Sequence, residues 1–239
     1  NIHFDFIFYS LAAWGLIRGH FATIWDYGFV PAPVIGLLPE MAGLAIAGPG
    51  ELGFRLGGAL FGLSGVVAVY VLGRVYRDRL TGLLAALLLS GSIPFIHFSR
   101  TTANGDAATA GLWTIVFFVL AVRFGHPRWW ILTGLAAGYC FYLWPGARIA
   151  VVACFAWGLV LGVRSPRAAL RRWLGIPLAM ASFAVWLVPL VPMWKVNSRL
   201  AMPRVEESLE VYKPNEGVHW DRVKESFGAP LARSFGWFF

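Results

Sequence analysis

The chain has 239 residues, of which 58% are hydrophobic and 13% are charged, and its mean hydropathy is +0.66. A soluble domain carries about a quarter charged residues, so this chain has too few polar side chains to cover a water-facing surface. Aromatic residues make up 16% of the chain, which excludes disorder. The two cysteines, Cys140 and Cys154, are too few for a disulfide framework or a four-cysteine zinc site. The composition therefore predicts a polytopic membrane protein.

The first 55 residues are apolar, but charged side chains interrupt them. These are Asp5, Arg18, Asp26, Glu40 and Glu51. Pro31 and Pro33 stand before a further apolar run, and proline suits the first turn of a helix. We therefore expect residues 1–55 to form a loop with short helices at the membrane surface.

Six apolar runs follow, and each is a candidate to cross the bilayer, which takes about 20 residues of helix. They cover residues 56–73, 80–98, 107–122, 129–144, 149–163 and 173–194. The segment 195–239 holds 13 of the 32 charged residues and is expected to face water. The predicted fold class is all-α: short juxtamembrane helices over 1–55, a bundle of about six transmembrane helices over 56–194, and a polar segment over 195–239.

The net charge of +8 comes mainly from arginines at the ends of these runs. The two short connections 99–106 and 145–148 carry one arginine each, Arg100 and Arg148. The alternate connections carry nine: Arg74, Arg77, Arg79, Arg123, Arg128, Arg164, Arg167, Arg171 and Arg172. Basic residues favour the cytoplasmic side. We therefore expect the two arginine-poor connections and both terminal segments on the outer side of a plasma or inner membrane, and we expect no nucleic-acid partner.

This topology brings two acidic residues to the same membrane surface. Asp5 lies among apolar and aromatic residues, where a partly desolvated carboxylate suits a general base; an interfacial Asp or a helix cap explains it as well. Asp106 precedes the run 107–122, and a helix N-cap also explains that position. An acid beside an apolar span is a functional candidate, so we predict that Asp5 and Asp106 are catalytic.

Three further side chains are predicted to bind substrate. Arg100 can grip a phosphate with a bidentate fork, although an ion pair with Asp106 is an alternative. Arg204, in the polar segment, can stabilise the negative charge of a departing phosphate. His97 lies three residues before Arg100, and a structural role explains it equally well. No metal ligand is predicted, and a divalent cofactor is left open.

Several short motifs between residues 31 and 106 stand in a characteristic order. They are PAP (31–33), GELGFRLGGALFG (50–62), VYVLGR (69–74), TGLLAALLL (81–89) and FSR (98–100), followed by Asp106. This order resembles the membrane glycosyltransferases of the GT-C class, and the nearest type is the protein O-mannosyltransferase and aminoarabinose lipid A transferase family. The resemblance covers roughly residues 5–125. The family usually has Asp-Glu at its first acidic site, where this chain has Asp5-Phe6.

The resemblance implies an enzyme that moves a sugar from a polyprenyl-phosphate donor to a hydroxyl group of a protein, lipid or glycan on the outer face, with inversion. It implies that Asp5 matches the first-loop catalytic Asp, Asp106 the second acidic position, and Arg100 the Arg shortly before it. Family members have spans before and after the matched region, and this chain starts without Met, so we expect a fragment of a longer protein.

Two other classes stay open from the sequence: a multi-pass transporter or flippase, and a non-catalytic protein that binds polyprenyl lipid. Transporters tend to carry acidic residues near the middle of a span and to contain inverted repeats. Here Asp5 and Asp106 are expected at one membrane surface, and no repeat is visible, which favours the enzyme. The Asp5-Phe6 departure keeps the non-catalytic alternative open.

Overall fold

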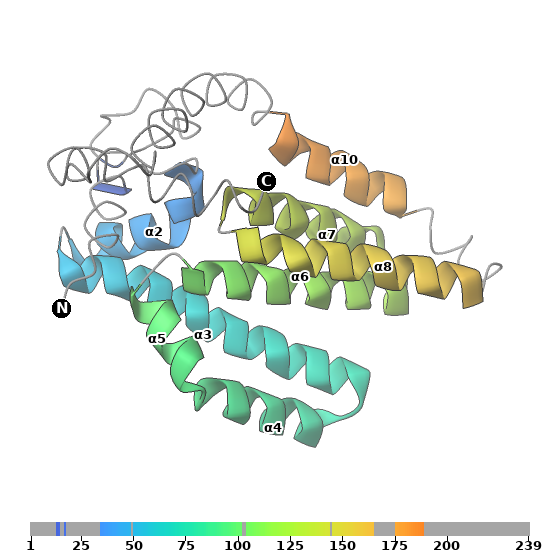
Figure 1. Ribbon diagram of the computed structural model, residues 1–239, viewed down its shortest axis with the longest axis horizontal. Coiled ribbons are helices and arrows are strands. Elements are labelled where there is room, and N and C mark those ends of the chain that lie inside the picture. Colours follow the sequence, from blue (N-terminus) through green and yellow to red (C-terminus); the bar gives the residue numbers. More distant parts are fainter. Residues whose placement is uncertain are drawn as a thin grey trace, which may run out of the picture. The chain divides into compact units, whose positions relative to one another are not determined.

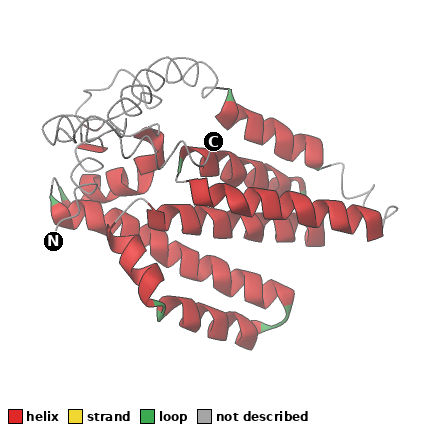
Figure 2. Ribbon diagram, in the orientation of Figure 1, coloured by secondary structure: helices red, strands yellow, loops and turns green. Residues whose placement is uncertain are grey.

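The computed structural model describes residues 13–14, 17, 34–48, 50–101, 104–143, 145–164 and 175–188. The regular secondary structure of these residues is entirely helical (Figure 2). The chain separates into two compact units, Asn1–Val188 and Pro189–Phe239, and every described residue belongs to the first. The described residues do not include Asp5, Arg204 or the expected boundary at 194/195. The roles of the two residues and the position of the boundary therefore stay predictions.

The described helices follow the apolar runs of the sequence. In chain order they are η1 (Val34–Leu37), α2 (Leu38–Ala47), α3 (Glu51–Tyr76), α4 (Arg79–Ser90), α5 (Ile93–Thr101), α6 (Asn104–Phe124), α7 (Pro127–Tyr139), η2 (Cys140–Tyr142), η3 (Pro145–Ala147), α8 (Arg148–Arg164) and α10 (Ile176–Leu187). Each of the six runs expected to span the membrane overlaps one of these helices or a broken pair of them.

Helix length and exposed surface both fit a bilayer. Among the described helices, α3 and α6 are long and apolar enough to cross a membrane, and the bent pair α4–α5 makes a third if it is one span. The helices α2, α8 and α10 are apolar and shorter. The exposed side chains of α4 and α8 are mostly Leu, Val, Ile and Phe, which suit hydrocarbon better than water. The predicted all-α membrane bundle is confirmed.

The run 80–98 is broken rather than straight, because α4 and α5 meet at an angle of 67°. Pro94 lies at the start of α5 and has no N–H to donate to the carbonyl of Ser90, so the α4 ladder cannot continue through it. The chain closes α4 instead with the N–H of Gly91 donating to the carbonyl of Leu87 at 3.0 Å. The break turns α5 toward the start of α6.

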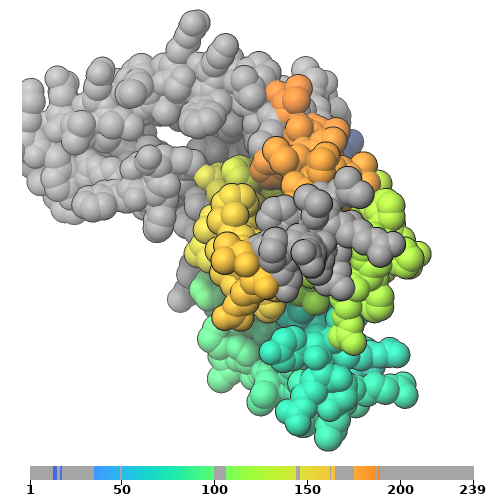
Figure 3. Space-filling model, turned by 90° about the vertical axis from the view of Figure 1, so that its right-hand side faces the viewer, coloured from blue at the N-terminus to red at the C-terminus, as the bar shows by residue number. Residues whose placement is uncertain are grey.

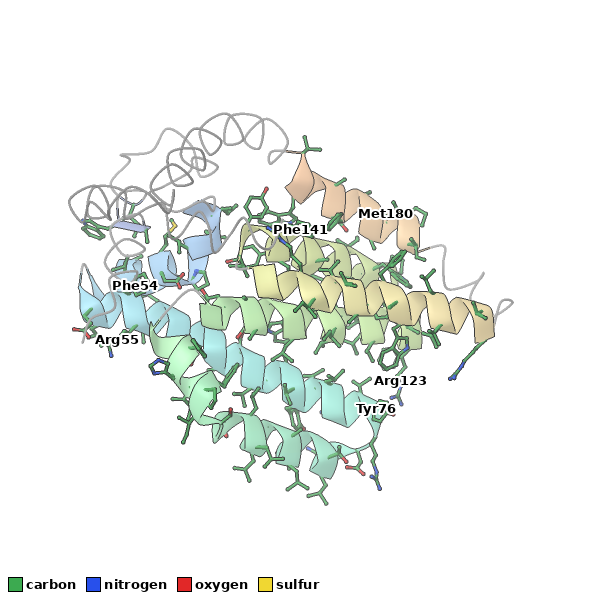
Figure 4. The ribbon with its side chains drawn as sticks, viewed as in Figure 1. Phe54, Arg55, Tyr76, Arg123, Phe141 and Met180 are labelled. Carbon is green, nitrogen blue, oxygen red and sulfur yellow. The ribbon has the colours of Figure 1, made fainter. Side chains whose placement is uncertain are left out.

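Successive long helices run in opposite directions, so the arginine-bearing connections gather at one end of the bundle (Figure 1). We call this the basic end; its described arginines are Arg74, Arg77, Arg79, Arg123, Arg128 and Arg164. In the view onto it, the α3–α4 turn, the α6–α7 turn and the C-terminal end of α8 are all at the surface (Figure 3). Tyr76 and Arg123 lie at this end, whereas Phe54 and Arg55 lie at the opposite end (Figure 4).

Small residues allow the helices to approach closely, as is common in membrane bundles. A Cβ added to Gly73 on α3 would lie only 2.7 Å from the Cα of Gly82 on α4. On α7, a Cβ at Gly138 would lie 2.7 Å from the Cβ of Trp186 on α10. The apolar core between α3 and α6 is formed by Ala68, Val116 and Leu120. Helix α6 is central, because it packs against α3, α5, α7 and α8.

Candidate functional site

Glu40 lies in the first turn of α2, and only 1% of its surface is exposed. Pro39 occupies the start of the same helix, where its missing N–H costs no hydrogen bond. A negative side chain in the first turn is favoured by the unpaired N–H groups and the dipole of the helix. Burial raises the pKa of Glu40 from 4.5 to about 6, while a hydrogen bond with Asp106 acts in the opposite direction.

Two glycines bring α2 against α3 and so set the position of Glu40. A Cβ on Gly57 would overlap the carbonyl of Pro39 and would lie 2.7 Å from the Cα of Glu40. A Cβ on Gly43 would lie 2.8 Å from the Cα of Gly57. With no side chain on either glycine, the backbones of the two helices are in contact, and Glu40 is carried into the interior rather than to the surface.

Asp106 lies in the first turn of α6, and 1% of its surface is exposed. The helix begins at Asn104, so Asp106 lies inside the first turn and not at the N-cap position before it. Its side chain forms a hydrogen bond with that of Glu40. A hydrogen bond between two carboxyl groups requires one of them to carry a proton. The structure thus joins two acidic residues that come from different helices.

The carboxyl pair is surrounded by other polar groups at the end opposite the basic end. The hydroxyl of Tyr139, at the end of α7, donates to the carbonyl of Gly36 at 3.2 Å and lies within electrostatic reach of both acids. Thr109 lies one turn after Asp106 and is fully buried. Three buried oxygens have no hydrogen-bond partner among the described residues: Glu40 Oε2, Asp106 Oδ2 and Thr109 Oγ1.

The two basic candidates in the described part lie on α5, next to the start of α6. The side chain of His97 is exposed, and its ring meets that of Phe98 edge-on at 5.5 Å between centroids, so His97 is not part of the buried pair. Arg100 is in the last turn of α5, and its side chain lies outside what the structure describes. Helix α5 is held close to α3 at Ser99, whose Cα would lie 3.9 Å from a Cβ on Gly62. Asp5 and Arg204 lie outside the described residues.

Carboxylate and hydroxyl oxygens are typical ligands of hard divalent cations. Across the described residues, no group of three or more His, Cys, Asp or Glu side chains is arranged to hold a metal ion. Cys140 and Cys154 are both buried free thiols, and Cys140 Sγ lies 3.5 Å from the hydroxyl oxygen of Thr114. The described side chains of this site offer carboxyl and hydroxyl oxygens.

Glu40 was noted in the sequence only as a charge that interrupts an apolar segment, and it was not predicted as a site residue. One signal could have identified it: an acidic side chain directly after Pro39 in an otherwise apolar helix is costly unless it is paired. The sequence does not reveal the partner, because Asp106 follows only after three intervening helices.

These features define a class of protein: an integral membrane helix bundle with a buried acidic pair at one end and basic turns at the other. The family model of dolichyl-phosphate-mannose-protein mannosyltransferases matches residues 31–194, and the chain belongs to this family. It is thus a membrane glycosyltransferase of the mannosyltransferase type. No curated protein and no solved structure matches the chain. The match includes Glu40, His97, Arg100 and Asp106, but neither Asp5 nor Arg204.

Proposed function

We propose that this protein transfers a sugar from a polyprenyl-phosphate donor to a hydroxyl group of a protein, lipid or glycan, at the outer face of a cell membrane. The observation that carries the proposal is the buried Glu40–Asp106 pair within the region that matches the family. Buried acids that contact each other are costly for folding and are typical of functional sites. The apolar surface of the bundle supports a donor with an isoprenoid tail.

The proposed reaction is a direct displacement at the anomeric carbon. The acceptor oxygen forms the new glycosidic bond as the bond from carbon to phosphate oxygen breaks, so the configuration inverts. The acceptor proton passes to a carboxylate, and the departing phosphate keeps the electron pair of the broken bond. We assign the proton transfer to Asp5, with Asp106 as the second acidic residue of the site.

The departing phosphate needs positive charge close by. We assign this role to Arg100 and Arg204, and donor binding to these two with His97. The position of Arg100 at the α5–α6 junction supports its assignment, because Asp106 lies in the first turn after this junction. No metal ion is needed for these steps, and a divalent cation bound with the phosphate would act in the same way as the arginines.

The outer-face location is supported by the basic end of the bundle. Basic connections favour the cytoplasm, and Glu40 and Asp106 lie at the other end of the helices (Figure 1). The donor would then enter the site from the outer leaflet.

The test is transfer of radiolabelled mannose from polyprenyl-phosphate mannose by the full-length protein in lipid nanodiscs. Asp5→Asn should lower turnover by about 100-fold or more with little change in donor binding, since a general base acts on the acceptor. Arg100→Ala should weaken donor binding by about 1.5–3 kcal/mol, the range for a hydrogen bond to a charged group. Arg77→Ala, at the exposed α3–α4 turn, is the control and should change neither.

Two results would contradict the proposal. Donor binding without any sugar transfer by the wild-type protein would favour the non-catalytic lipid-binding class. Movement of the intact lipid between leaflets of a vesicle, without transfer of its sugar, would favour the flippase class. Normal turnover by a well-folded Asp5→Asn variant would remove Asp5 from the mechanism.

A further inference from the structure

The hydrogen bond between Glu40 and Asp106 joins two helices that have no direct connection along the chain. Both side chains are 1% exposed, and each keeps one carboxyl oxygen without a hydrogen-bond partner among the described residues. The contact therefore places two acidic groups in an environment that excludes water. The two acids therefore titrate together, because the charge on one changes the proton affinity of the other.

Two carboxylates in contact cannot both be ionised cheaply, because like charges repel strongly in a buried site. Two neutral acids are also disfavoured. The pair lies in the N-terminal turns of both α2 and α6, and each turn stabilises a negative charge. The state that fits both facts has one proton and one negative charge. Each acid then satisfies the other through one charge-assisted hydrogen bond.

We propose that Glu40 is a positioning residue that holds Asp106 through one shared proton, so that the pair carries a single negative charge at neutral pH. This inference rests on the proposed role of Asp106 in the glycosyl transfer. Glu40 would not touch the substrate; it would fix the rotamer of Asp106 and keep its charge state constant. The remaining Asp106 oxygen, Oδ2, is buried and has no hydrogen-bond partner among the described residues.

Among the residues that the structure describes, the groups around the pair are compatible with one charge. At the end of α7, the hydroxyl of Tyr139 donates a hydrogen bond to the carbonyl of Gly36 at 3.2 Å. The next residue, Cys140, has a buried thiol. From α3, the residue against Glu40 is Gly57, which brings no ionisable side chain. Glu51 and Arg55 of the same helix form an ion pair. Burial also raises the pKa of Glu40, in the direction that favours a proton retained by the pair.

Contacts other than the carboxyl group of Glu40 hold α2 in place, so the shared proton can be tested without moving the helix. Helix α2 is held on α3 by the backbone contact at Gly43 and Gly57. The segment before α2 is held on α7 by the hydrogen bond from Tyr139 to Gly36. Removing the acidic group of Glu40 with an isosteric amide should therefore leave α2 in place and change only the proton that is shared with Asp106.

The test is infrared spectroscopy of the full-length protein in nanodiscs, where a protonated buried carboxyl group gives a band distinct from those of carboxylates. At neutral pH the wild type should show this band. Both Glu40→Gln and Asp106→Asn should lose it, since either change removes one of the two carboxyl groups that share the proton. Glu51→Gln, which alters an exposed acid paired with Arg55, is the matched control and should keep it. Persistence of the band in both pair variants would overturn the proposal.

Sugar transfer gives the second readout. Glu40→Gln should lower kcat by about 10-fold, the lower range for a changed hydrogen bond to a charged group, and should leave KM for the donor unchanged. We expect wild-type activity to fall as the pH is lowered through about 6, and this loss should move to another pH in Glu40→Gln. Glu40→Asp should restore part of the kcat that Glu40→Gln loses. An unchanged pH profile in a folded Glu40→Gln variant would show that the role of Glu40 is structural only.

These outcomes separate the inference from the proposed function. A wild-type protein that transfers no sugar contradicts the proposed function, yet its infrared band still shows whether the proton is shared. A protein that transfers sugar but has no protonated carboxyl at neutral pH contradicts the inference alone.

Discussion

Glu40 has a carboxyl group whose ionisation opposes folding, because the charged form must leave water. Burial raises the pKa of this group from 4.5 to about 6 in the folded protein. Between these values the folded state binds more protons than the unfolded state. The contribution of Glu40 to stability is therefore complete below pH 4.5 and is lost as the pH rises through about 6.

We predict that the stability of the wild type and that of Glu40→Gln depend differently on pH. The wild-type protein should lose thermal stability as the pH rises from about 4.5 to about 7, whereas the amide variant should lose less over the same range. Thermal unfolding in detergent micelles, measured at a series of pH values, gives both curves. Glu51→Gln should follow the wild type, since this acid is exposed; a parallel fall in all three proteins would refute the assignment to Glu40.

At the scale of helices, backbone contacts decide where side chains meet. Helix α2 can lie on α3 only because Gly43 and Gly57 leave no side chain between them. This crossing carries Glu40 to Asp106, so the glycines determine the geometry of the acidic pair without taking part in its chemistry. Other pairs of helices use the same device, as at the contact of Gly73 with Gly82.

We predict that Gly57→Ala destabilises the protein and weakens its activity. The added Cβ would overlap the carbonyl of Pro39, so α2 must shift, and the free energy of unfolding should fall by about 1–3 kcal/mol, as for overpacked cores. Gly158→Ala is the matched control, because its Cβ would meet Phe118 at an ordinary 3.6 Å. That variant should keep or slightly raise stability through better helix propensity. Equal effects of the two changes, measured by denaturation in micelles, would argue against a close α2–α3 crossing.

At the scale of the whole molecule, charge is distributed unevenly between the two ends of the bundle. Alternating helix directions place the arginine-bearing turns together, with Arg77 and Arg128 among them, while the Glu40–Asp106 pair lies at the other end (Figure 1). Insertion of a membrane protein retains basic connections on the cytoplasmic side. The same pattern that fixes orientation thus determines which face of the membrane the acidic pair approaches.

Orientation can be measured by labelling introduced cysteines in intact cells, in a background where Cys140 and Cys154 are replaced. Gly146→Cys, at the exposed position of η3 before α8, should react with an impermeant maleimide added from outside. His126→Cys, in the exposed α6–α7 turn, should react only after permeabilisation. Both positions are exposed, so accessibility within the protein does not explain a difference. The reverse labelling pattern would place the acidic pair on the cytoplasmic face.

Much of the architecture follows from the sequence by local rules. Apolar runs of sufficient length must be helical in a bilayer, because every backbone polar group needs a partner there. Arginines between the runs therefore mark the ends of helices, as Arg123 and Arg164 do. The motifs from residue 31 to Asp106 indicated the family that the match over 31–194 establishes. The candidate acid Asp106 was likewise visible, because a charge next to an apolar run is unusual.

The tertiary structure alone decided that Asp106 is joined to Glu40 and that both are buried. A side chain's partner depends on how distant helices cross, and that depends on contacts such as the one between Gly57 and the backbone of Pro39. The angle of 67° between α4 and α5, which directs α5 toward the start of α6, is a second property of this kind. Hydropathy and charge act along the chain and fix which segments are helices; the pairing of two acids is fixed by the packing of the helices that carry them.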